Sequence, residues 1–395
     1  GILKIFPFFV LNILMDLKLF FDPVDESILD SALSPSAFQN IIYLHTVKKI
    51  NLKGIRVALI GLGEGRGHMI DHGIAHVPNR IRKCLYQLTM RLDHDGILDL
   101  GDLRDGPTFE DTNLRLKEVC EYLLSQEILP VIFGGLQNFT VGQYLSYEST
   151  GKLVTLLNID AKLDLEEPES GIDSYLGDIF KHNPNYLFNY IHLGYQSYLL
   201  KESRLNMLET LGFDAYRLGE FRGNIKEAEP IIREADLISF DLSAIQSIYC
   251  PDTTNPNVFG YSGEEACQLC WYAGLNSKLC SIGFYNITAK LDEDIKTAQV
   301  VATMIWYFID GVFNRVGDQY FKSSDYLIYE VSLNEGANNI RFFKSKLSEK
   351  WWMEIEETYQ KSVFSRNKLI PCSYNDYEMA LNGELPERWI KARSK

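Results

Sequence analysis

The sequence predicts a three-layer α/β/α fold with a mostly parallel, doubly wound sheet. Two observations support this prediction. Short apolar runs alternate with amphipathic helical patterns along most of the 395 residues, and this alternation favours right-handed crossovers and a parallel sheet. The apolar runs are also mostly continuous, which is typical of strands that helices cover on both faces.

Eight segments have the length and apolar content of buried strands. They cover residues 56–61, 97–100, 129–133, 153–159, 190–194, 237–241, 278–285 and 326–331. Because no linker rich in Pro or Gly separates them, we expect all eight to belong to one large domain.

Helical patterns lie between these runs. One helix is predicted by five apolar residues at i, i+3, i+4, i+7 and i+8, which form a single stripe. They are Leu116, Val119, Cys120, Leu123 and Leu124. Asp102, Asp105 and Asp111 are expected to be loop and cap residues for this helix. Pro78 has the position of a first helical turn, ahead of a second apolar stripe.

Two later helices have recognisable ends. Ser262 and Glu265 have the spacing of a capping box, and Gly274 is expected to end the helix that they begin. A longer helix is expected over residues 293–309, and Gly311 is expected to stop it.

We expect the chain to have three parts. Residues 1–14 are mostly apolar, and we interpret them as a non-native or mis-started extension because no small-residue cleavage site of a targeting signal follows. Residues 15–344 are expected to form the α/β domain. Residues 345–395 are rich in aromatic residues, which are expected to pack on that domain, with a partner-binding patch as the alternative.

Composition restricts the class of partner. The net charge of −14 disfavours nucleic acid and anionic membranes. A hydrophobic content of 46% and a charged content of 23% are those of an ordinary globular protein. Seven Cys residues, an odd number, do not suggest a disulfide framework and fit a reducing compartment. We therefore expect a cytoplasmic protein.

Three short polar segments each follow a predicted strand. They read G-G-L-Q-N at residues 134–138, D-A-K-L-D at 160–164 and S-F-D-L-S at 239–243. Ligands of open parallel sheets bind at the carboxyl ends of strands, so we expect the polar side chains of these segments to share one pocket. These side chains are Gln137, Asp160, Lys162, Asp164, Asp241 and Ser243.

The three segments resemble motifs of the ureohydrolase family, which includes arginase, agmatinase and, most similar here, formimidoylglutamase. The family's motifs read G-G-D-H-S, D-A-H-x-D and S-x-D-x-D, and their His and Asp residues hold two manganese ions. In this chain the two His positions are Gln137 and Lys162, and the last Asp position is Ser243. The resemblance covers most of the chain from Met15, and it implies an arginase-like fold and a homo-oligomer, a trimer or hexamer.

The resemblance also extends to the substrate end of the pocket. The family has an E-x-N-P segment whose Glu helps to bind the substrate. Here Phe284 has the position of that Glu, and Asn286 matches the Asn. The family's proton-shuttling His has no match, and His182 is the nearest candidate.

The donor set does not favour manganese, which prefers carboxylate and imidazole ligands. Lys162 would repel a dication as an ammonium, so we expect no cofactor. A single weakly held cation at Asp160, Asp164 and Asp241 is the alternative. We hypothesise that the Lys162 ammonium takes the place of the metal and neutralises the three carboxylates. A second, less favoured role for Lys162 is that of a catalytic base or nucleophile.

Two function classes follow from this pocket. The first is a catalytically degenerate, metal-free protein that binds a small-molecule ligand or a protein partner, or acts as a scaffold. The alternative is a manganese-dependent hydrolase of a C–N bond in formimidoylglutamate or a guanidino compound, that is, an enzyme acting on linear amidines.

Two other groups of residues have the spacing of a metal or redox site, but each has a simpler explanation. His68, His72 and His76 recur every four residues, but the glycines around them oppose a metal-binding helix. Cys267 and Cys270 form C-x-x-C without a second pair, so we expect buried thiols and not a zinc or redox site.

Overall fold

The computed structural model describes residues 15–46, 50–66, 73–91, 94–165, 175–289, 295–318, 323–333, 338–355 and 368–394. Within these residues the main sheet has ten strands. They are β1 (Phe21–Asp22), β2 (Tyr43–Leu44), β3 (Val57–Leu62), β4 (Ile97–Leu103), β5 (Leu129–Gly134), β6 (Val154–Ile159), β7 (Leu187–Tyr195), β8 (Asp214–Arg217), β9 (Leu237–Asp241) and β10 (Ser281–Tyr285). Their order is β1-β4-β3-β5-β10-β9-β6-β7-β8, and β2 also pairs with β4.

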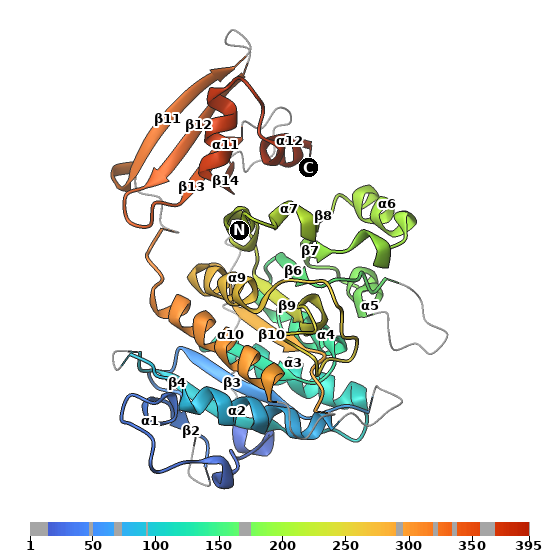
Figure 1. Cartoon of the computed structure of the whole chain (residues 1–395), viewed down its shortest axis with the longest axis vertical. Helices are drawn as coiled ribbons and strands as arrows, with labels where there is room; N and C mark the ends of the chain where they lie inside the picture. The colour runs from blue at the N-terminus through green and yellow to red at the C-terminus, as the bar shows by residue number, and fades with distance from the viewer. Residues whose placement is uncertain are drawn as a thin grey trace, which may run out of the picture.

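All pairings in this sheet are parallel except that of β1 with β4. The strands at its centre are fully buried, because helices cover both faces. One face packs against α2 (Val77–Gln87), α9 (Gly263–Leu275) and α10 (Lys296–Phe313). The other packs against α3 (Phe109–Ser125), α4 (Thr140–Leu145) and α5 (Tyr175–Lys181), as Figure 1 shows. The predicted three-layer α/β/α fold is confirmed.

Most of the predicted element boundaries agree with the structure. Seven of the eight predicted strands lie in the main sheet as β3, β4, β5, β6, β7, β9 and β10. Thr108 and Asp111 form a capping box at the start of α3, and Ser262 and Glu265 form the one at the start of α9. Asp102 differs from the prediction, because it lies in β4.

The eighth predicted strand belongs to a second sheet. β11 (Tyr326–Leu333) pairs with β12 (Asn338–Ser345), and β13 (Trp351–Ile355) and β14 (Lys368–Cys372) complete a four-stranded antiparallel sheet. With α11 (Tyr374–Leu381) and α12 (Glu387–Ser394) it forms the C-terminal unit. Residues 326–344 therefore group with this unit and not with the parallel sheet, because an apolar run predicts a strand but not its sheet. Residues 1–14 lie outside the described part of the chain.

The prediction that Gly311 stops a helix is wrong, because α10 continues to Phe313. Gly311 instead lies where α9 and α10 touch. A Cβ on Gly311 would lie 2.6 Å from the Trp271 carbonyl oxygen, and one on Gly274 would lie 2.2 Å from the Phe308 carbonyl oxygen. The two glycines thus allow close helix packing. No helix in the described residues is long and apolar enough to span a membrane.

Candidate functional site

The predicted pocket residues lie at the carboxyl edge of neighbouring strands. Gln137 begins a short 3-10 helix after β5, Asp160 follows β6, and Asp241 ends β9. Because β6 pairs with β9, and β10 joins β9 to β5, these positions meet at one edge. Gln137, Asp160 and Asp241 are almost fully buried, at 1%, 1% and 4% exposure.

The three remaining positions surround this cluster. Ser243 is buried, whereas Lys162 and Asp164 are half-buried. Asp160 and Asp241 lie at the carboxyl ends of the paired strands β6 and β9, and Asp164 follows Asp160 by four residues. The segments that carry these six residues therefore lie at one edge of the sheet, and the pocket itself stays a prediction.

Gln137 is held in place by neighbouring strands. Its Nε2 donates to Asn158 Oδ1 at 2.8 Å and to Ser239 Oγ at 3.2 Å. Asn158 lies in β6 and Ser239 in β9, so one amide bridges two strands. Its Oε1 is buried without a hydrogen-bond partner among the described residues. The Gln137 side-chain N–H groups therefore donate to neighbouring strands, and the side-chain oxygen is an acceptor without a partner among the described residues.

Asp241 is bound by the chain through both carboxylate oxygens. Oδ1 accepts from the Ser243 backbone N at 2.7 Å, and Oδ2 accepts from Asn286 Nδ2 at 2.8 Å. Asn286 has a left-handed φ of 63°, and its Oδ1 accepts from the Gln137 backbone N at 3.0 Å. Asn286 therefore links the segment of Gln137 to that of Asp241.

Asp160 is only half satisfied. Its Oδ1 accepts from the Lys162 backbone N at 2.9 Å, while Oδ2 is buried without a hydrogen-bond partner among the described residues. Burial raises the pKa of the Asp160 carboxyl well above its ordinary value, and the negative charges of Asp241 and Asp164 raise it further. Burial likewise raises the pKa of Asp241, against the hydrogen bonds from Ser243 and Asn286. The two acids thus favour protonation.

Lys162 acts on this pair at a distance. Within the described residues its side chain forms no ion pair with Asp160 or Asp241. Its positive charge nevertheless lowers the pKa of both carboxyls, although by less than burial raises them. That the Lys162 ammonium takes the place of the metal among all three carboxylates stays a prediction. Lys162 is a nearby cation that offsets part of the carboxylate charge.

The sequence did not identify a buried histidine, His192, that contacts the backbone of Asp160. His192, in β7, is fully buried and contacts the Asp160 carbonyl oxygen through Nε2 at 3.1 Å. Its Nδ1 contacts the Tyr190 hydroxyl at 2.9 Å. Burial lowers the pKa of His192 to about 4, so the ring is neutral near pH 7. A single His within an apolar strand gives no sign in the sequence that it will contact Asp160.

The two other positions taken from the resemblance lie elsewhere. Phe284 is fully buried in β10, and its ring stacks on Phe240 with centroids 6.1 Å apart. It belongs to the hydrophobic core against α9 and α10. His182 packs edge-on against the rings of Tyr144 and Tyr186.

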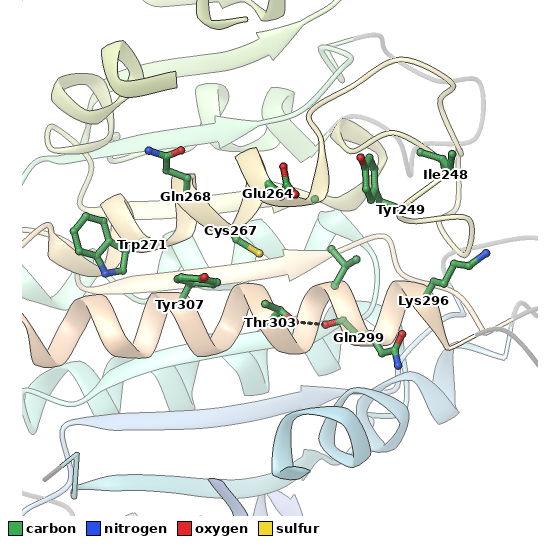
Figure 2. A pocket seen from close by; sticks show the side chains of 12 residues that line it. Ile248, Tyr249, Glu264, Cys267, Gln268, Trp271, Lys296, Gln299, Thr303 and Tyr307 are labelled. Atoms are coloured by element: carbon green, nitrogen blue, oxygen red, sulfur yellow. Dashed lines mark hydrogen bonds between the residues drawn. The ribbon is translucent and has the colours of Figure 1, made fainter. Parts of the chain in front are cut away.

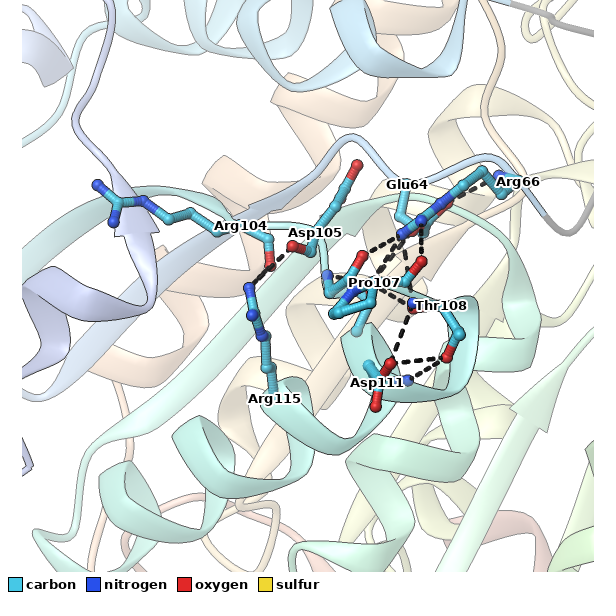
Figure 3. Close-up of polar contacts among 10 residues, drawn as sticks. Glu64, Arg66, Arg104, Asp105, Pro107, Thr108, Asp111 and Arg115 are labelled. Carbon is cyan, nitrogen blue, oxygen red and sulfur yellow. Dashed lines mark hydrogen bonds and ion pairs between the residues drawn. The ribbon is translucent and has the colours of Figure 1, made fainter.

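The Gly-rich loop after β3 is tied to the start of α3. Glu64, only 1% exposed, forms an ion pair with Arg66 and accepts from Thr112 Oγ1 at 3.1 Å. Arg66 Nη1 also donates to the Pro107 carbonyl oxygen at 2.8 Å. Figure 3 shows these contacts as one cluster beside the Thr108 capping box. The polar groups of this cluster bond to one another within the chain, so the cluster links the loop after β3 to the start of α3.

The remaining sequence signals have ordinary structural explanations. His76 ends a short 3-10 helix, Ile74–His76, whereas residues 68 and 72 lie outside the described part of the chain. Cys267 and Cys270 are free thiols in α9. Cys270 is buried, as predicted, but Cys267 is half-buried and lines an open groove of about 630 Å³ between α9 and α10. Figure 2 shows Trp271 and Tyr307 on the two helices that form this groove.

The raised pKa of Asp160 predicts an unusual pH dependence. A carboxyl whose folded-state pKa exceeds its unfolded value contributes stability below the unfolded pKa and loses it as the pH rises through the folded pKa. Asn cannot ionise, so Asp160→Asn should raise the melting temperature more at about pH 8 than at about pH 5. Thermal unfolding at both pH values measures this difference, with the exposed Asp95→Asn as control. A lower melting temperature at both pH values would contradict the prediction.

Comparison with known proteins supports the fold and the family. The Arginase family model matches residues 55–310. The chain is 24% identical to the formimidoylglutamase of Streptococcus gordonii over 280 residues, which cover 65% of this chain and 84% of that protein. It is also 24% identical to the formimidoylglutamase of Staphylococcus haemolyticus over 305 residues, which cover 71% of this chain and 96% of that protein.

Two solved structures show the same fold. The formimidoylglutamase of Bacillus subtilis aligns with a TM-score of 0.63 and 17% identity, covering 76% of this chain and 98% of that one. The formiminoglutamase of Trypanosoma cruzi, solved with Mn²⁺, aligns with a TM-score of 0.61 and 17% identity, covering 67% of this chain and 96% of that one. The parallel-sheet body of this chain therefore belongs to the arginase family.

Proposed function

We propose that this arginase-family protein works by binding and does not hydrolyse a C–N bond. The observation that carries the proposal is the set of side chains at the strand ends. Three positions have carboxylates, and the other three have an amide, an ammonium and a hydroxyl. A bridged manganese pair needs several carboxylate and imidazole ligands to activate water. Gln137, Lys162 and Ser243 supply neither.

Hydrogen bonding in the pocket supports this proposal. Asp241 gives both oxygens to Ser243 and Asn286, and Gln137 gives its amide donors to Asn158 and Ser239. Two potential ligand positions are thus fixed by protein contacts. Among the described residues, no group of three or more His, Cys, Asp and Glu side chains is arranged to hold a metal ion. These hydrogen bonds support a site whose shape is held by the chain itself.

The free polar atoms indicate what such a pocket would bind. Gln137 Oε1 is a buried acceptor without a partner among the described residues, and Asp160 Oδ2 becomes a second one when a bound N–H donor keeps that carboxyl ionised. Buried acceptors beside carboxylates favour a small ligand with N–H donors. We therefore propose a small-molecule ligand for this pocket, with a role as sensor or scaffold. A cytoplasmic location is part of the proposal, since the Cys residues of the described chain are free thiols. The trimer or hexamer stays a prediction.

A manganese-dependent hydrolase is the second candidate. Two observations favour it. The relatives described above are named formimidoylglutamase, and Asp160, Asp164 and Asp241 keep carboxyl groups at three of the positions that resemble the family's metal ligands. In this case the protein would cleave a C–N bond of formimidoylglutamate or of a guanidino compound.

An activity assay separates the two candidates. The full chain is incubated with excess Mn²⁺ and with formimidoylglutamate, agmatine or arginine, and the release of formamide, ammonia or urea is measured. We expect no release above the uncatalysed rate. Turnover that disappears in Asp241→Asn would refute the binding role and support the hydrolase.

A further inference from the structure

The loop of residues 246–260, which we call the rim loop, lies between the end of β9 and the start of α9. Its two ends lie side by side. Gln246 N donates to the Tyr261 carbonyl oxygen at 2.9 Å, and Tyr261 N donates to the Ala244 carbonyl oxygen at 2.8 Å. A Cβ on Gly260 would lie 2.4 Å from the same Ala244 oxygen, so this close approach requires glycine. The rim loop is therefore held in place at the carboxyl end of β9.

The rim loop is hydrogen-bonded to two segments of the candidate site. Thr254 N donates to the Asn286 carbonyl oxygen at 3.0 Å. Asn257 Nδ2 donates to the Ser243 carbonyl oxygen, also at 3.0 Å. Asn286 and Ser243 are the two residues that donate to the Asp241 carboxylate. The rim loop is thus bound directly to the residues that hold Asp241.

A third link passes through Gln196, which directly follows β7. Its backbone N donates to the carbonyl oxygen of Ala161, the residue after Asp160, at 3.0 Å. Its side chain is only 4% exposed, and Nε2 donates to the Phe259 carbonyl oxygen at 2.8 Å. Gln196 Oε1 accepts from the Tyr198 hydroxyl. Gln196 therefore joins the rim loop and Tyr198 to the segment of Asp160.

Three large apolar side chains of these segments are exposed to solvent. Tyr198 is 66% exposed, Val258 74% and Phe259 58%. A single exposed apolar side chain is ordinary, whereas several on neighbouring segments are typical of a binding surface. These three belong to two segments that meet at Gln196. The apolar surface therefore adjoins the segments that carry the candidate site.

The rim and the strand ends differ in the ligand groups that they favour. The rings of Phe259 and Tyr198 can pack against a flat ring, either offset-stacked or edge-on. They also attract an organic cation that lies over a ring face. The strand ends, with their carboxyl and amide oxygens, favour N–H donors. A ligand that contacts both therefore has N–H donors attached to an aromatic group.

We propose that Tyr198, Val258 and Phe259 form an apolar rim of the candidate site and select a small molecule with N–H donors on an aromatic group. The proposal rests on the binding function proposed above, because the strand ends hold the N–H donors. The rim adds selectivity, since an aromatic group that packs there is removed from water and a short aliphatic group gains less.

Two amidines test this selection. Acetamidine and benzamidine present the same N–H donors and differ in the group that carries them, a methyl or a phenyl. In separate calorimetric titrations of the full chain, benzamidine should bind roughly 10-fold more tightly than acetamidine. Equal affinities would refute the rim and leave the binding function standing. Failure of both to bind at up to about 10 mM would refute both proposals.

A matched pair of variants locates the selection. Phe259→Ser removes the ring but keeps the backbone carbonyl that accepts from Gln196, so benzamidine should fall to within about 3-fold of acetamidine. The affinity for acetamidine should not change. The control is Phe188→Ser, at a side chain 57% exposed near the amino end of β7, and it should leave both affinities unchanged. Full selectivity in Phe259→Ser would overturn the rim.

A second variant and a second measurement complete the test. If Phe259→Ser does not fold, Val258→Ser should give a smaller loss of selectivity in the same direction. Sedimentation of the ligand-free protein addresses contact of this surface with another protein chain, and we expect the same oligomeric state in Phe259→Ser as in the parent. A changed oligomeric state with unchanged amidine selectivity would assign the surface to a protein interface and contradict the proposal.

Discussion

Replacing Arg82 by Met should lower the free energy of unfolding by about 3–5 kcal/mol. Arg82 is fully buried and binds Asp99 twice, from Nε at 2.9 Å and from Nη2 at 3.0 Å. Its Nη1 binds Asp102. Asp99 is also fully buried, so the substitution leaves a carboxylate in the core without its countercharge. Such an unpaired charge costs more than the lost hydrogen bonds alone.

Urea unfolding followed by circular dichroism measures this loss. Lys83→Met is the matched control, because it makes the same kind of change on the exposed side of the same helix. The control should change the unfolding free energy by no more than about 0.5 kcal/mol. If Arg82→Met were as small in effect as the control, the buried ion cluster would not be a main support of the body.

Gly274→Ala should lower the free energy of unfolding by about 2–3 kcal/mol. The added Cβ would lie 2.2 Å from the Phe308 carbonyl oxygen and 2.8 Å from Gly311 Cα. Both are backbone atoms of α10, so no side chain can rotate to relieve the clash. The two helices would have to separate and lose part of their packing.

Gly219→Ala provides the control for this change. Gly219 also lies in a helix, α7 (Leu218–Phe221), but its Cβ would meet no atom within 4 Å. Ala is the better helix former, so this variant should be neutral or more stable by about 0.5–1 kcal/mol. Equal melting temperatures for Gly274→Ala and the parent would contradict close packing at this crossing.

The fold could be predicted because its signals are local. Continuous apolar runs identify strands with both faces covered, and the capping residues Thr108 and Ser262 mark helix starts. Two of the errors concern long-range arrangement. Nothing in residues 326–331 shows that the strand joins an antiparallel sheet. A glycine such as Gly311 can either end a helix or allow close contact with a second helix, and the sequence does not distinguish the two cases.

The edge of the sheet at which Asp160 and Asp241 lie could also be predicted, but the contacts between their neighbours could not. Asp160 follows one apolar run and Asp241 ends another, so the parallel direction of their strands brings both to one edge of the sheet. The contacts of His192 and Asn286 depend on which strands are neighbours, which the sequence does not state. The sequence also does not show how deeply the Asp160 carboxyl is buried. Burial raises the pKa of Asp160 more than Lys162 lowers it, which the charges alone would not predict.

Metal analysis tests the central claim most directly. The purified chain is saturated with Mn²⁺, desalted, and measured for bound manganese per chain. Because the pocket offers carboxylates but neither imidazole nor a fourth acid, we expect far less than one tightly bound ion per chain. Two ions per chain, lost in Asp160→Asn and Asp241→Asn, would show that the pocket is a working metal centre and would contradict the account.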